Sequence, residues 1–126
     1  MDKDFILSKI KLFVPNDSNN PNYDSAIEYV VDKVMQDIAN YTHIPLKELP
    51  DGLKYTAVGM SVDLINSTEM LVPQAERNNG ISSVTEGDES VTFKSIAEDI
   101  SLVNQTNSVT KDYYYQLNSY RRLNFD

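Results

Sequence analysis

The spacing of apolar residues along the chain predicts a mainly helical protein. Near the N-terminus, five positions recur at helical intervals: Phe5, Ile6, Lys9, Ile10 and Phe13. Val14-Pro15 should end this first helix, because the residue before a proline is disfavoured in the helical region. The segment NDSNNPN that follows, residues 16 to 22, has the composition of a loop.

The clearest helical pattern lies between residues 25 and 42. One apolar stripe runs through Ile27, Val30, Val31, Val34, Ile38 and Tyr41. Ser25 and Glu28 have the spacing of a capping box, and Asn22 is an alternative cap one turn earlier. The helix should stop near Thr42, because an Ile-Pro pair follows at 44–45.

A third helix is expected at residues 53 to 66, after the connector LKELPDG. Its apolar residues point in almost every direction around the helix, which predicts burial at the centre of a bundle or against a neighbouring subunit. Gly59 costs about 1 kcal/mol relative to alanine in a helix interior. Either another backbone passes close to Gly59, or the glycine is simply tolerated.

The stretch SSVTEGDESVTFK, residues 82 to 94, predicts a β-hairpin with Gly87-Asp88 as its turn. One face would hold only hydroxyl side chains. The other face and the tip would hold the residues expected to contact a neighbouring subunit or a channel: Val84, Glu86, Asp88, Glu89, Val91 and Phe93. An isolated hairpin is marginal in water, so this one should need support along its Val/Phe face.

The remaining sequence predicts one more helix near the C-terminus. Residues 96 to 106 have a mixed pattern, whereas Tyr113, Leu117 and Tyr120 recur at helical spacing after a cap at Ser108 or Thr110. The expected fold is a small, mainly α helical bundle of about four helices, with one protruding β-hairpin or long loop. We expect a single domain over residues 1 to 126, in which residues 112 to 126 form a C-terminal helix and a docking tail.

Composition and charge narrow the classes of function. The net charge of the 126 residues is −8, and residues 14 to 110 hold fifteen acidic but only five basic side chains. Such a body is unsuited to wrapping nucleic acid, because phosphate binding requires lysine and arginine. The chain has no cysteine, which excludes disulfides and thiolate metal sites. We expect neither a membrane span nor a signal peptide, and therefore a protein kept in a cytoplasm.

No catalytic, cofactor or metal site is expected. The glycines are not spaced as a phosphate-binding loop, and the single His43 has no second histidine or cysteine to complete a zinc site. The acids of EGDE lack the spacing of a calcium loop. The eight tyrosines could stack on bases, but the acidic background favours packing or protein contact.

Several short stretches together resemble a known family. Residues 48 to 70 (ELPDGLKYTAVGMSVDLINSTEM) contain a Leu-Pro-x-Gly-Leu turn before an apolar helix that ends near Asn66. A Gly-Ser-Glu-rich strand segment ending in Phe93 and the C-terminal Leu117, Tyr120, Arg121, Arg122 and Leu123 follow in order. This arrangement resembles the small head–tail connector, or head-completion, proteins of tailed bacteriophages, the QLRG-type DNA-packaging family. The sequence departs from the family pattern in two places, at residues 65–69 and in the longer stretch from Leu71 to Asn79.

The resemblance implies a structural virion protein that joins head to tail after DNA packaging, at the head–tail interface, following assembly in the host cytoplasm. It implies a homo-oligomeric ring below the portal, sharing the portal's twelve-fold symmetry, with the packaged DNA passing through without specific binding. The partners would be the portal protein and the next head-completion or tail-completion protein. The docking residues expected from this resemblance and from interface composition are Tyr120, Arg121, Arg122, Leu123 and Phe125.

Two other classes of function stay open on the sequence. A small phage or prophage regulatory or nucleic-acid-binding protein would need a basic recognition helix, and the one Arg-Arg pair lies at the C-terminus. A small hydrolase would need a convergent polar pocket, which the sequence does not suggest. The tyrosine and leucine of the tail could equally pack the last helix and leave the arginines in solvent.

Overall fold

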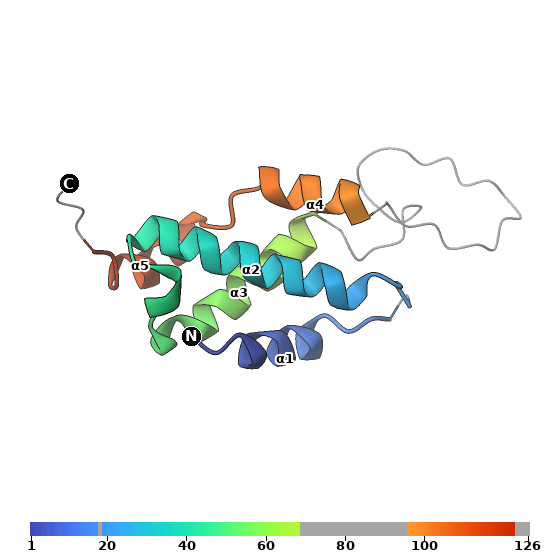
Figure 1. The fold of residues 1–126 in the computed structure, drawn as a ribbon, viewed down its shortest axis with the longest axis horizontal. Helices are drawn as coiled ribbons and strands as arrows, with labels where there is room; N and C mark the ends of the chain where they lie inside the picture. The colour runs from blue at the N-terminus through green and yellow to red at the C-terminus, as the bar shows by residue number, and fades with distance from the viewer. Residues whose placement is uncertain (18, 69–95, 123–126) are drawn as a thin grey trace, which may run out of the picture.

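The computed structural model describes residues 1–17, 19–68 and 96–122. Five α-helices lie in this part of the chain: α1 (Lys3–Phe13), α2 (Tyr23–Thr42), α3 (Lys54–Thr68), α4 (Ile96–Gln105) and α5 (Lys111–Asn118). Figure 1 shows them packed as one elongated bundle, with α5 at one end. The mainly helical fold is therefore confirmed. The hairpin expected within residues 82 to 94 lies outside the described residues.

Helix α2 is the longest helix of the bundle and contacts each of the other four α-helices. Its predicted stripe is buried completely from Ile27 to Ile38, which confirms the periodicity as the signal for the core. The helix begins at Tyr23 with Asn22 at the N-cap, so the alternative cap is correct and the box starting at Ser25 is not used.

A left-handed residue ends α2. His43 has φ of 60° and ψ of 30°, and its backbone N–H donates to the carbonyl of Ala39. This is the usual way in which a helix satisfies its last carbonyl groups, although glycine is the residue best suited to it. Two short 3₁₀ turns, η1 (Leu46–Glu48) and η2 (Asp51–Leu53), then lead into α3.

Helix α3 lies inside the bundle and contacts α1, α2, α4 and α5. Its buried side chains come from several sides of the helix: Ala57, Val58, Met60, Ser61, Leu64, Ile65 and Thr68. The first of the two expected explanations, a place at the centre of the chain's own bundle, is therefore correct. The apolar surface of α3 does not supply a large face for a neighbouring subunit.

The smaller helices cover this pair. In α1, Ile6 and Ile10 are fully buried, whereas Phe13 is 66% exposed and does not join the predicted stripe. Residues 96 to 105, whose pattern gave no clear prediction, form α4, with Val103 buried in the core. Helix α5 begins after Thr110, one of the two caps considered, and buries Leu117.

Candidate docking surface

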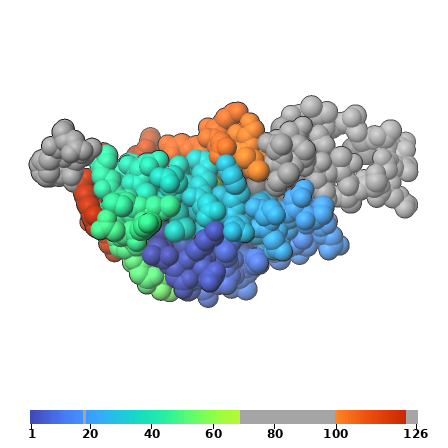
Figure 2. All heavy atoms as spheres, in the orientation of Figure 1, coloured from blue at the N-terminus to red at the C-terminus, as the bar shows by residue number. Residues whose placement is uncertain are grey.

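The chain after α5 folds back onto the end of α2. The backbone N–H of Arg122 donates to the carbonyl oxygen of Thr42 at 2.7 Å. The carbonyls of a helix's last turn lack partners within the helix, so this bond satisfies one of them from a distant segment. Figure 2 shows the red C-terminal region beside the surface formed by the end of α2 and its connection to α3. Residues 120 to 122 therefore belong to the folded bundle.

Arginine and tyrosine side chains stack at this junction. The guanidinium carbon of Arg121 lies 5.0 Å from the centre of the Tyr41 ring, within cation–π range. The rings of Tyr41 and Tyr114 are nearly parallel, with an interplanar angle of 4° and centroids 5.9 Å apart. The hydroxyl of Tyr41 also donates to Asn118 Oδ1 at 2.7 Å. These contacts fix α5 and the residues after it against α2.

The charges of Arg121 and Arg122 suit their position. The sequence of α2 has no basic residue in its last turn, where the helix dipole is negative. The two arginines, both exposed, bring positive charge to that end from the C-terminal segment. On a chain of net charge −8, this corner is a local basic feature.

Two tyrosines of the C-terminal region lie over two glycines. The position where a side chain of Gly59 would begin is 3.1 Å from the Tyr113 hydroxyl, and the Tyr120 hydroxyl lies directly on Gly52. The glycines are seven residues apart, and so are the tyrosines, in the opposite order. The pairing thus fixes the register of an antiparallel contact. The close approach inferred at Gly59 is real, but a tyrosine side chain makes it, not a backbone.

Tyr113 forms a further contact across the same junction. Its hydroxyl donates to a carboxylate oxygen of Asp63 in α3. Burial, followed by this hydrogen bond and the negative charge of Asp63, raises the pKa of Tyr113 well above its usual value. The phenol therefore stays protonated and keeps donating throughout the physiological pH range.

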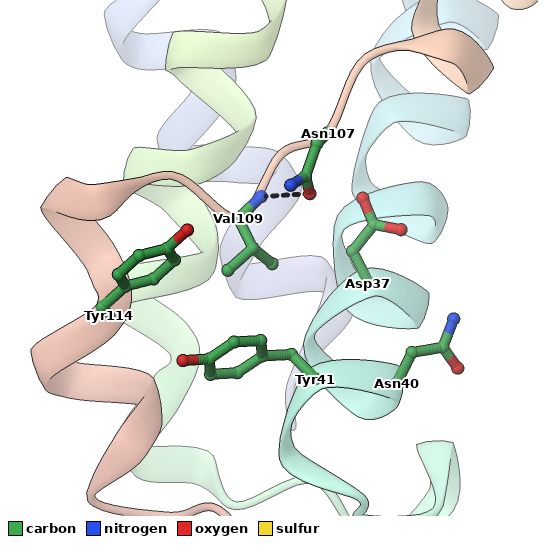
Figure 3. Close-up of a pocket in the computed structure, with 6 residues that line it drawn as sticks. All are labelled: Asp37, Asn40, Tyr41, Asn107, Val109 and Tyr114. Atoms are coloured by element: carbon green, nitrogen blue, oxygen red, sulfur yellow. Dashed lines mark hydrogen bonds between the residues drawn. The ribbon is translucent and has the colours of Figure 1, made fainter.

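A hollow of about 310 Å³ with a mixed polar and apolar lining opens beside the stacked rings. It is lined by residues of α2, of the connection between α4 and α5, and of α5: Asp37, Asn40, Tyr41, Asn107, Val109 and Tyr114 (Figure 3). A second hollow of about 350 Å³ shares Asp37 and continues along α2 past Lys33 and Tyr29. Together the two hollows form a shallow groove along α2, next to Arg121 and Arg122.

The hollow offers hydrogen bonding and aromatic contact rather than an activated group. The carboxylate oxygen Oδ2 of Asp37 accepts from Lys33 Nζ at 2.7 Å and from Ser108 Oγ at 2.6 Å. Asn107 Oδ1 accepts the backbone N–H of Val109 at 3.0 Å (Figure 3). These groups hold the connection before α5 in place on α2.

The predicted docking residues are only partly covered by the structure. Tyr120, Arg121 and Arg122 lie after α5 and contact the end of α2 and η2. Leu123 and Phe125 lie outside the described residues, and so do all the hairpin residues: Val84, Glu86, Asp88, Glu89, Val91 and Phe93. Tyr41 and Tyr114 were not predicted as site residues. Tyr41 lies on the exposed edge of the α2 stripe, which is the signal that could have found it.

Other apolar side chains are exposed on α1 and near the start of α3. Leu12 and Phe13 are exposed at the end of α1. Tyr55 is 68% exposed and packs edge-on against Phe5, and the ammonium group of Lys54 lies 4.7 Å from the centre of the Phe5 ring. The described surface therefore has at least two separate regions that are rich in apolar and aromatic groups.

Two kinds of feature, a membrane-spanning helix and a metal site, are absent from the described residues. Within them, no helix combines the length and apolar character that crossing a bilayer requires. In residues 1–17, 19–68 and 96–122, no three histidine or acidic side chains gather as a metal site would need. His43 lies exposed at the end of α2, where its role is to end the helix.

Comparisons of the chain with protein-family models, with curated proteins and with solved structures find no match. The resemblance to phage connectors therefore rests on the sequence stretches that carry it.

Proposed function

We propose that this chain is a head–tail connector protein of a tailed bacteriophage. In this role it assembles as a ring below the portal, completes the head after DNA packaging and binds the next component of the tail, and its place is the virion. The role is structural and needs no catalytic site or cofactor. The order of the resembling stretches supports this function, together with the surface at the C-terminal end.

The composition and exposure of the C-terminal surface carry the proposal. Tyrosine and arginine dominate the residues that contribute most to protein interfaces. Here Tyr114, Tyr115, Tyr120, Arg121 and Arg122 are all exposed, with Tyr115 at 84%. They lie where the resemblance places the segment that docks on the portal.

In the proposed ring, the contact between subunits would come mainly from surfaces other than the buried sides of α3. A closed ring requires two different patches, one on each side of the subunit. The end of α1, with Leu12 and Phe13, and the C-terminal surface are two such regions on the described residues. The hairpin expected at residues 82 to 93 would add to one of these contacts.

The tail is tested by truncation. Deleting residues 120–126 should leave a folded helical bundle and abolish binding to the portal protein of the same phage genome. Since the deletion removes the N–H that bonds to Thr42, we expect a modest loss of stability, on the order of the ~1 kcal/mol of one hydrogen bond. Circular dichroism, thermal unfolding and a portal pull-down measure these effects.

Two comparisons complete the test. A shorter deletion of residues 123–126 keeps every described contact of the tail and separates the role of Leu123 and Phe125 from that of the arginines. The proposal is wrong if the 120–126 truncation binds portal as well as the full chain does. The remaining alternative, a regulatory protein, predicts instead a monomer or dimer that binds a DNA oligomer in size-exclusion chromatography with light scattering.

A further inference from the structure

The three described docking residues are already occupied within the chain. The Tyr120 hydroxyl lies on Gly52, the Arg121 guanidinium lies over Tyr41, and the Arg122 N–H is bonded to Thr42. A side chain that contributes strongly to an interface is usually buried in a pocket of the partner. To be buried in this way, the inward-facing parts of Tyr120 and Arg121 must first leave their own bundle.

The attachment of this segment is small enough to open. Leu117 is the one buried side chain that the structure describes in α5, and residues 118 to 122 are all exposed. Tyr113 of α5 is partly buried against the core, whereas residues 119–122 are held by the Tyr120 and Arg121 side-chain contacts and by hydrogen bonds at the solvent boundary. Segments with few buried apolar contacts open at much lower free energy than the core.

We propose that residues 119–122 form a self-docked clasp that competes with partner binding. In the closed state they lie on Gly52, Tyr41 and Thr42; in the open state Tyr120 and Arg121 turn outward and bind the partner. This inference rests on the proposed function, because the partner is the portal protein. It adds that the free subunit is held in a weakly binding state until it meets that partner.

A substitution at Gly52 can test the clasp separately from the residues that bind the partner. A β-carbon there would overlap the Tyr120 hydroxyl, whereas the backbone of Gly52 lies outside the left-handed region and accepts an L side chain without strain. The atom displaced is the end of a half-exposed side chain, so Tyr120 can swing into solvent at little cost. Gly52→Ala should therefore open the clasp without changing any residue proposed to bind the partner.

Population arithmetic gives the expected size of the effect. If only a fraction of the molecules is open, the apparent dissociation constant exceeds the intrinsic one by the inverse of that fraction. A clasp that is mostly closed thus weakens binding by about three- to tenfold. Gly52→Ala should lower the apparent dissociation constant for the partner by the same factor.

The experiment combines amide exchange with affinity. Hydrogen exchange followed by NMR on the free protein should show a protected Arg122 amide in the wild type and faster exchange at residues 119–122 in Gly52→Ala. The amides of α2 and α3 should stay protected in both proteins. Binding to immobilised portal protein should be about three- to tenfold tighter for Gly52→Ala.

Two further variants sharpen the result. Tyr41→Leu removes the ring beneath Arg121 and should tighten binding in the same direction. Asp51→Ala is the matched control, because it changes the neighbouring residue, whose ion pair is with Lys54, and should leave both exchange and affinity unchanged.

The outcomes separate the inference from the proposed function. Tighter binding by Gly52→Ala and Tyr41→Leu supports the clasp. Equal or weaker binding by these variants, with a wild type that does bind portal, overturns the competition and leaves the connector function intact. A wild-type protein that shows no portal binding, with Gly52→Ala behaving the same way, overturns both.

Discussion

At the scale of single residues, buried hydroxyl groups show how the bundle treats polar atoms. In α2, Thr42 Oγ1 donates to the Ile38 carbonyl at 2.7 Å, and in α3, Thr68 Oγ1 donates to the Leu64 carbonyl at 2.8 Å. Ser61 is also fully buried in α3, yet its hydroxyl has no hydrogen-bond partner among the residues described. A buried polar atom without a partner is destabilising.

Replacing Ser61 by alanine should therefore stabilise the protein. The change removes the unpaired hydroxyl and introduces the residue with the highest helix propensity, so we expect the free energy of unfolding to rise by about 1 kcal/mol. Urea denaturation followed by circular dichroism measures it. Thr68→Val is the control in the same helix, since it removes a paired hydroxyl and should give no gain. A loss of stability in Ser61→Ala would contradict this account.

At the scale of elements, periodicity identified the helices that bury one stripe. Helix α2 could be predicted nearly to its ends, because the stripe from Ile27 to Ile38 is long and Pro45 limits its extent. The burial of α3 was also evident, since its apolar residues surround the helix. The segments that cover α3 could not be predicted, because they depend on contacts between parts of the chain that are far apart in the sequence.

The elements that were missed have physical reasons. Helix α4 was not predicted, although Ile96, Ile100 and Val103 recur at helical spacing, so the segment interpreted as mixed did carry a helical signal. Phe13 fits the helical spacing of α1 but lies at its last residue, beyond the part that α2 and α3 cover. The Tyr–Gly contacts could not be predicted because nothing in the sequence indicates that the helix at Tyr113 runs antiparallel to the one at Gly59.

The contact between α3 and α5 can be tested by a double-mutant cycle. Gly59→Ala gains about 1 kcal/mol of helix propensity, but its β-carbon would lie 3.1 Å from the Tyr113 hydroxyl and 3.3 Å from Cε1. We expect little or no gain in the wild-type background. In a Tyr113→Ala background the crowding is absent, and the same substitution should stabilise by about 1 kcal/mol. Equal effects of Gly59→Ala in both backgrounds, measured by chemical denaturation, would show that the tyrosine does not crowd the glycine.

At the scale of the whole molecule, acidic charge surrounds an interior that the chain covers with its own helices. Most ion pairs that the structure describes join lysines to acidic residues on the surface, such as Lys3 with Asp32 at 2.8 Å and Lys11 with Asp24 at 3.3 Å, whereas the pair of Lys33 with Asp37 is largely buried. Exposed pairs of this kind contribute little to stability. The excess of carboxylates therefore acts mainly on what approaches the surface.

The net negative charge of the protein predicts that it binds duplex DNA weakly. A ring through which DNA passes should repel phosphate at short range, so we expect no measurable binding of duplex DNA at moderate salt. Fluorescence anisotropy with a labelled duplex tests the free protein and the assembled ring. A tight complex that weakens as salt is raised would exclude a repelling channel and favour the regulatory alternative.

The tyrosines at the junction of α2 and α5 have a practical consequence. The chain contains eight tyrosines and no tryptophan, so its ultraviolet emission comes from phenol rings alone. Tyr41 and Tyr114 lie in the stack, and Tyr113 donates to a carboxylate, a contact expected to quench an excited phenol. Release of α5 should change the intensity of this emission, which makes the unlabelled protein its own optical reporter.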